Sequence, residues 1–182
     1  MGISLAGIRQ PDFDNNGGIH NIDTFHHKIH EGVTFHTNSQ ATSIADEGTL
    51  QCLLTTGAKV AHLTFEAKTG GKSYVCVYET PRDVNATSGS AVTVYNMKRT
   101  SSTTPTVTFR QFVTVVNPGA TAIVNKELIP GGASQQTRIG GSATKDEEWI
   151  LKRNTQYLVG MQNVFGGAVD MSIQADWYEV EV

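Results

Sequence analysis

Hydrophobic and polar residues alternate along much of this chain with the period of two that is typical of β-strands. The clearest case is Lys59–Lys68, where from Ala61 onward small or large apolar residues alternate with polar ones. Thr69–Lys72 supplies the glycines of a tight turn, and Tyr74–Glu79 then carries apolar residues at both parities. We predict a β-hairpin over residues 59–79, whose second strand is covered on both faces by a second sheet or by a partner subunit.

Similar apolar runs recur elsewhere and are separated by clusters of Gly, Pro, Asn and Ser. They predict strands over residues 28–37, 49–55, 91–97, 106–116, 122–129, 157–163 and 169–182. Gly32 indicates a bulge or a close backbone approach in the first of these strands. A change of parity near Gln111 indicates a bulge or a corner between two sheets. Asp146–Lys152 is either a helical turn or a short strand.

About eight to ten strands with turns at roughly regular spacing predict an all-β fold, and an antiparallel jelly-roll-like β-sandwich fits this count best. The first residues, by contrast, hold isolated apolar side chains without a sustained period, and Pro11–Gly18 is rich in turn-forming residues. We expect residues 1–28 to form an extended N-terminal arm that becomes ordered on a neighbouring molecule. Residues 29–182 are then the β-sandwich domain.

The composition is consistent with one domain that needs no disulfide or metal to build its core, because the chain has 182 residues. The net charge is −3 and no Lys/Arg block occurs, so we expect no nucleic-acid partner. No apolar run approaches the ~18 residues of a membrane helix, so we expect no membrane partner either. The N-terminus lacks the pattern of a signal peptide, which predicts an intracellular or viral protein.

Two cysteines, Cys52 and Cys76, are too few for a disulfide framework. Both lie inside strand-like runs, so we predict free thiols in the core, with a cross-strand disulfide as the alternative.

The histidines are the first candidates for chemistry because a metal site needs two or three converging ligands. His30 and His36 share a face of one predicted strand but would lie about 20 Å apart. His26 and His30 would meet only on a helix, which the surrounding sequence does not favour. A cross-strand pair of His62 with His30 or His36 is the remaining arrangement. We predict no metal site and no cofactor.

No catalytic constellation stands out either. The carboxylates are scattered singly, and we expect them to lie on solvated edges: Glu66, Glu79, Glu127, Glu148, Asp176 and Glu179. Neither Ser88–Ser90 nor Gly140–Ser142 matches a nucleophile elbow, and the glycine-rich loops lack the ending of a phosphate-binding loop. The sequence therefore predicts a protein that is not an enzyme. A metal-dependent β-barrel enzyme would require a histidine-bound ion.

Aromatic side chains offer one alternative function, because exposed aromatic faces stack on sugars. Seven aromatic residues could line a sugar site: Tyr74, Tyr78, Tyr95, Trp149, Tyr157, Trp177 and Tyr178. Most of them occupy predicted core positions. A carbohydrate-binding jelly-roll module, such as a fibre tip or a lectin, is therefore the alternative interpretation.

A set of short strings occurs in order along the chain: 29–35 (IHEGVTF), 57–65 (GAKVAHLTF), 78–79 (YE), 96–99 (NMKR), 130–132 (PGG), 148–159 (EWILKRNTQYLV) and 176–179 (DWYE). Together they resemble the capsid decoration (cement) proteins of tailed bacteriophages, over about Ile29 to Glu179. Met97-Lys98 departs from the more Asn/Arg-rich turn of that family, and residues before Ile29 lie outside the resemblance. The resemblance implies a non-catalytic β-sandwich that assembles as a homotrimer, binds the outer capsid surface at local three-fold positions and clamps neighbouring major capsid proteins.

Overall fold

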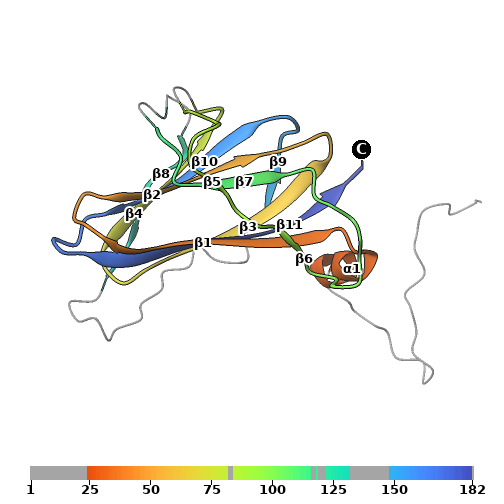
Figure 1. The fold of residues 1–182 in the computed structure, drawn as a ribbon, viewed down its shortest axis with the longest axis horizontal. Coiled ribbons are helices and arrows are strands. Elements are labelled where there is room, and N and C mark those ends of the chain that lie inside the picture. Colours follow the sequence, from red (N-terminus) through yellow and green to blue (C-terminus); the bar gives the residue numbers. More distant parts are fainter. Residues whose placement is uncertain (1–23, 82–83, 116–117, 119–121, 132–147, 182) are drawn as a thin grey trace, which may run out of the picture.

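The computed structural model describes residues 24–81, 84–115, 118, 122–131 and 148–181. These residues form a sandwich of two antiparallel β-sheets with one short helix (Figure 1). The elements run in the order α1 (Thr24–Glu31), β1 (Thr34–Ile44), β2 (Thr49–Thr55), β3 (Val60–Thr69), β4 (Ser73–Glu79), β5 (Ser90–Ala91), β6 (Tyr95–Asn96), β7 (Thr108–Gln111), β8 (Ala122–Ile129), β9 (Trp149–Leu151), β10 (Gln156–Asn163) and β11 (Val169–Val180). One sheet has the strand order β6-β1-β11-β3-β9, and the other β5-β7-β2-β10-β4-β8.

The strand pairing is that of a chain folded back on itself and then rolled up. Strands β1, β2, β3 and β4 pair antiparallel with β11, β10, β9 and β8, respectively. Successive strands of each half alternate between the two sheets, so these eight strands form a jelly roll. The short strands between β4 and β8 extend the sheet edges, β6 beside β1 and β7 with β5 beside β2. The predicted jelly-roll-like sandwich is confirmed.

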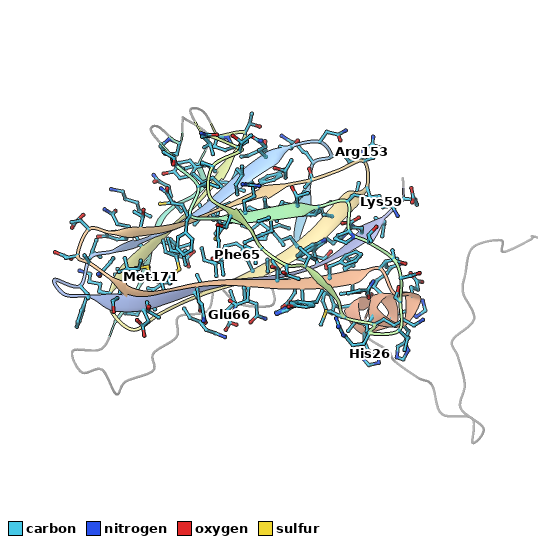
Figure 2. All side chains as sticks on the ribbon, in the orientation of Figure 1. His26, Lys59, Phe65, Glu66, Arg153 and Met171 are labelled. Atoms are coloured by element: carbon cyan, nitrogen blue, oxygen red, sulfur yellow. The ribbon has the colours of Figure 1, made fainter. Side chains whose placement is uncertain are left out.

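The core lies between the sheets and is built from the alternating residues of the sequence pattern. The odd-numbered residues of β3 and β11 point inward, and the largest side chain among them, Trp177, is fully buried. Figure 2 shows Phe65 and Met171 between the two layers and Glu66 on the outer side of its sheet. Burial of these apolar side chains, at ~25 cal/mol per Å², is the main force that holds the two sheets together.

The predicted hairpin over Lys59–Glu79 is wrong in its pairing, although both strands exist. Strand β3 belongs to one sheet and β4 to the other, so the turn between them crosses the sandwich. Gly71 in this turn is buried, and a Cβ on it would lie 2.6 Å from Val169 Cγ1 and 2.7 Å from Phe165 Cγ. A tight hairpin and a crossing between sheets both need glycine, so the composition of the turn does not distinguish them.

The predicted first strand, residues 28–37, is also wrong in its first half, because residues 24–31 form α1 and β1 begins at Thr34. The helix ends at Gly32, whose φ is +76°. Gly32 N–H donates to Ile29 O at 2.9 Å and Val33 N–H to Lys28 O at 3.3 Å, which is a Schellman motif. Gly32 is thus a helix cap and not a bulge. The predicted close approach is real, because a Cβ on Gly32 would lie 2.7 Å from Ser101 Oγ.

The boundary between an arm and a sandwich at residues 28 and 29 falls inside α1, and residues 1–23 lie outside the described part of the chain. The predicted strand 91–97 is two short strands on different sheets, β5 and β6. Residues 149–151 of the ambiguous Asp146–Lys152 segment form a strand, β9. The change of parity near Gln111 marks the end of β7, because Phe112 has a φ of +55° and turns the chain there.

Candidate interaction surfaces

The two outer faces of the sandwich carry different side chains. We call the outer face of the β6-β1-β11-β3-β9 sheet the helix face, because Figure 1 shows α1 on it at one end of the molecule, beside β6. We call the outer face of the β5-β7-β2-β10-β4-β8 sheet the loop face, because residues of the connection between β4 and β8 pack on it.

Polar side chains line up across three neighbouring strands of the helix face. Asp176 on β11 pairs in register with His36 on β1 and Thr64 on β3. His36 Nδ1 lies 2.6 Å from Asp176 Oδ1, and Gln174 Nε2 donates to the other carboxylate oxygen at 2.9 Å. Asp176 is 6% exposed. These partners satisfy a carboxylate that would otherwise be costly to bury.

A second polar group lies one position further along the same face, next to α1. Tyr178 Oη donates to Glu148 Oε1 at 2.9 Å and lies 2.9 Å from His62 Nδ1. His62 also bonds to Glu148, and its ring stacks on the Tyr178 ring with 4.5 Å between centroids. Phe25 of α1 meets the same tyrosine ring edge-on at 6.1 Å. Tyr178 therefore links the helix to the polar group beneath it.

The end of α1 is held by the 96–99 turn that figures in the family resemblance. Asn96 Nδ2 donates to Gly32 O at 2.8 Å, and Lys98 Nζ donates to His30 O at 2.9 Å. Ser101 Oγ donates to Gly32 O at 3.3 Å. These donors satisfy carbonyl groups at and just beyond the end of the helix, which have no partner within it. The turn thus fixes α1 to the helix face.

The sequence predicts a strand at His30, but His26, His27 and His30 all lie on α1. Because the helix exists, His26 and His30 meet, with 3.0 Å between their Nε2 atoms. His27 Nε2 lies 3.0 Å from Glu31 Oε1 on the same helix. The predicted alternative, a pair of His62 with His30 or His36, is not formed, because His62 and His36 each bond to a carboxylate. His20 lies outside the described residues.

The loop face carries a second, smaller apolar cluster. It is centred on the buried Leu53, Leu158 and Val113, and the half-buried members around them are Tyr78, Val84, Ala86 and Val115. Arg110 fixes the covering segment, since its guanidinium donates to the carbonyl oxygens of Thr87, Ser88 and Gly89 at 2.9 to 3.0 Å. This cluster covers part of the outer face of β4, the face for which either a second sheet or a partner subunit was expected.

A hollow of about 140 Å³ lies next to this cluster, above Gly160 of β10. A Cβ on Gly160 would meet one atom within 4 Å, Gln51 Cγ at 3.9 Å. Amide, hydroxyl, thiol and ammonium groups line the hollow together with apolar side chains; among them are Gln51, Gln162, Thr49, Tyr78, Cys76 and Lys126. Such a mixture can bind a small polar molecule through hydrogen bonds.

The two cysteines lie on opposite faces of the same sheet. Cys52 on β2 pairs with Val159 and points into the core, whereas Cys76 on β4 pairs with Gly160 and lines the hollow. Both thiols are free, as predicted, and the alternative of a disulfide is wrong. The core position is confirmed for Cys52 and wrong for Cys76. Burial raises the pKa of the Cys52 thiol to about 12.

Two of the carboxylates expected on solvated edges are buried, Asp176 and Glu179. Glu179 is 4% exposed, and its carboxylate accepts hydrogen bonds from Thr106 N and Oγ1, Val107 N and Trp177 Nε1. Hydrogen bonding to Lys152 lowers the pKa of Glu79, whose other carboxylate oxygen accepts from Tyr157 Oη at 3.2 Å. Glu66 pairs with Lys68 at 2.7 Å, and Glu127 is exposed.

One edge of the sandwich exposes apolar side chains. Strands β8 and β9 are the last strands of their sheets among the described residues. Ile123 of β8 and Trp149 of β9 line the same small apolar gap between the sheets. On the outer faces of these strands Leu128 is 48% and Ile150 is 69% exposed. We call Ile123, Leu128, Trp149 and Ile150 the β8–β9 edge. The sequence did not reveal it, because edge position depends on the pairing of strands.

The aromatic residues considered for a sugar site are dispersed. Trp177 and Tyr157 lie in the core and Tyr178 is buried under α1, while Tyr74 and Tyr78 are half-buried on the loop face. Tyr95 is exposed on β6, where Arg99 lies over its ring at 5.5 Å.

Within the described ranges, no three His, Cys, Asp or Glu residues are arranged to hold a metal ion. The helix in that part of the chain is not long and apolar enough to cross a membrane. Comparisons of the chain with protein-family models, with curated proteins and with solved structures find no match.

Proposed function

We propose that this chain is a structural virion protein, a capsid decoration protein that binds the outer surface of a phage head as a homotrimer and stabilises neighbouring major capsid proteins. The ordered strings between Ile29 and Glu179 support this proposal. The jelly roll supports it as well, since this fold is common in viral capsid proteins and in lectins.

The observation that carries the proposal is the β8–β9 edge. Proteins commonly protect the edges of their sheets with charged side chains, because an open edge invites pairing with other chains. Strand β8 does expose Lys126 and Glu127, but Leu128 next to them is exposed as well, and β9 presents Ile150 to solvent next to the half-buried Trp149. Exposed apolar side chains on open edge strands support a contact of this edge with another protein chain. In a homotrimer, each copy would cover this edge with a neighbouring copy.

The first test is the native mass of the protein by light scattering. We expect a trimer near three times 19.7 kDa, which Ile150→Asp converts into a monomer by placing a charge in the interface. Phe112→Asp is the matched control, because Phe112 is also exposed but follows β7 in the other half of its sheet. A trimer that survives Ile150→Asp would move the interface away from this edge.

The second test concerns the capsid itself. A protein that binds the assembled head and not its separated subunits stabilises the head by mass action, and three linked contacts raise its avidity. Heads that carry the protein should therefore release DNA at a higher temperature than bare heads. Equal release temperatures with and without the protein would refute the stabilising role.

A third test concerns the N-terminal residues. Removal of residues 1–23 should leave the sandwich folded and lower the occupancy of the protein on heads.

The hollow above Gly160 favours one second candidate, a carbohydrate-binding module. Its Gln51, Gln162 and Lys126 side chains are donors suited to sugar hydroxyls and carboxylates. A glycan array would then show a bound class of sugars, and Gln51→Ala would weaken that binding. Head binding that Gln51→Ala leaves unchanged, together with an array without hits, would favour the decoration protein.

A further inference from the structure

Two histidines of α1 share a geometry that the other described histidines lack. His26 and His30 are four residues apart on the helix and therefore lie on one side of it. Their Nε2 atoms are 3.0 Å apart and their ring centroids 4.8 Å apart. Both residues are exposed, and Figure 2 shows His26 on the side of α1 that is turned away from the sheets. The two ring nitrogens therefore converge at a point that solvent can reach.

The other described histidines are engaged with acids. His36 bonds to Asp176, His62 bonds to Glu148, and His27 lies 3.0 Å from Glu31. Within the described residues, the imidazole ring of each of His26 and His30 makes its hydrogen bond to the other imidazole. Such a pair shares one proton between two nitrogens that are both good metal ligands. A metal ion can bind both Nε2 atoms when the ring that donates this hydrogen bond carries its proton on Nδ1 instead, so that both rings stay neutral.

The separation of the two nitrogens also fits a metal ion. An imidazole nitrogen binds a first-row transition metal at about 2.0–2.1 Å. Two such bonds to nitrogens that are 3.0 Å apart enclose an angle of about 90–97° at the metal. This is close to the angle between neighbouring ligands in square-planar and tetragonal sites, which Cu²⁺ and Ni²⁺ prefer. Tetrahedral Zn²⁺ requires a slightly wider separation.

We propose that His26 and His30 form a two-histidine chelate for a divalent transition-metal ion, with Cu²⁺ and Ni²⁺ favoured over Zn²⁺. The scaffold is fixed before the ion binds, because Lys98 and Asn96 hold the end of α1 and Phe25 packs on Tyr178. Two protein ligands leave the other coordination positions to water or to a donor on a second protein. The ion then ties two turns of α1 together and makes the helix a metal-dependent point of contact. This site is independent of the β8–β9 edge.

The test is calorimetric titration of the full-length, tag-free chain with Cu²⁺, Ni²⁺ and Zn²⁺. We expect one saturable site, tightest for Cu²⁺ and weaker for Ni²⁺ and Zn²⁺. His26→Gln and His30→Gln should each weaken binding by at least the 10–100-fold that loss of a mere outer-shell partner causes. His27→Gln is the matched control, because His27 lies on the same helix but pairs with Glu31; it should bind Cu²⁺ as tightly as the wild type.

A variant that disturbs the helix could lose affinity for that reason alone. Electron paramagnetic resonance of the Cu²⁺ complex therefore serves as a second measurement, because it detects the coordinated imidazole nitrogens directly. The wild type and His27→Gln should show two coordinated imidazole nitrogens, and His30→Gln should show one or none. Absence of saturable Cu²⁺ binding by the wild type would overturn the proposal. Cu²⁺ affinities of His26→Gln and His30→Gln that match the affinity of the wild type would overturn it as well. The same holds if His27→Gln loses as much affinity as these two variants do.

Discussion

The helix face and the loop face are the outer sides of two sheets that both turn every second residue into the core. Polar side chains and a helix cover the helix face, whereas apolar side chains cover the loop face. On the helix face, Asp176 and Glu148 pair with histidines, and α1 rests on the face through Phe25. On the loop face, Leu53 and Leu158 are buried under a segment of apolar residues, beside an open hollow. Polar contacts with a partner that is exposed to solvent contribute little to stability, whereas apolar burial contributes much. We therefore expect the loop face to stabilise the fold and the helix face to hold a helix in position.

The largest expected difference is between the two cysteines, which lie on the inner and outer sides of the loop-face sheet. Cys76 lines the hollow and should react with a thiol reagent in the folded protein. Cys52 is 0% exposed and burial raises its pKa to about 12, so it should react only when the core opens. We expect rates that differ by on the order of 10³ or more, read by mass spectrometry. Cys76→Ser should abolish the fast reaction; fast labelling at Cys52 would mean that the two sheets separate readily.

The next effect in size is the loss of apolar packing on the loop face. Leu158→Ala should lower the free energy of unfolding by about 2–5 kcal/mol, because Leu158 is fully buried in the second cluster. Leu158→Met, which keeps the volume, should cost less than about 1.5 kcal/mol. Urea denaturation measures both. A cost of Leu158→Ala below that of Leu158→Met would mean that the covering segment is loosely attached.

Most strands of the sandwich could be predicted from the sequence, because a strand with one buried face carries an apolar residue at every second position. The predicted strand 49–55 coincides with β2, and the alternation that ends in Trp177 marks the core side of β11. The helix α1 was missed because its eight residues are too few to show a helical period.

The polar pairs of the helix face could not be read from the chain. His36 and Asp176 are 140 residues apart, and they meet only because β1 lies beside β11 in a particular register. A shift of that register by one residue would turn one of the two side chains to the other face. The assignment of β3 and β4 to different sheets was missed for a related reason: it depends on the partners of both strands, β11 and β10, which lie far along the chain.

A smaller effect is expected from the polar link between α1 and the helix face. Tyr178→Phe keeps the ring that Phe25 contacts and removes the hydroxyl that bonds to Glu148 and His62. The free energy of unfolding should fall by about 0.5–1.5 kcal/mol. Tyr95→Phe, at an exposed position on β6, is the control and should leave stability unchanged. Hydrogen exchange of the α1 amides should accelerate in Tyr178→Phe; an unchanged rate would mean that the 96–99 turn holds the helix without this link.

The smallest predicted effect tests whether the hollow of the loop face is open space. Gly160→Ala places a methyl group where one atom lies within 4 Å, Gln51 Cγ at 3.9 Å. A Gly→Ala change without strain restricts the unfolded chain, so the free energy of unfolding should rise by about 0.4–1 kcal/mol. Gly71→Ala is the matched opposite, because its Cβ would lie 2.6 Å from Val169 Cγ1, and it should destabilise the protein. If both variants unfold at lower urea concentration than the wild type, the space above Gly160 is filled, and the sugar-binding alternative loses the observation that favours it.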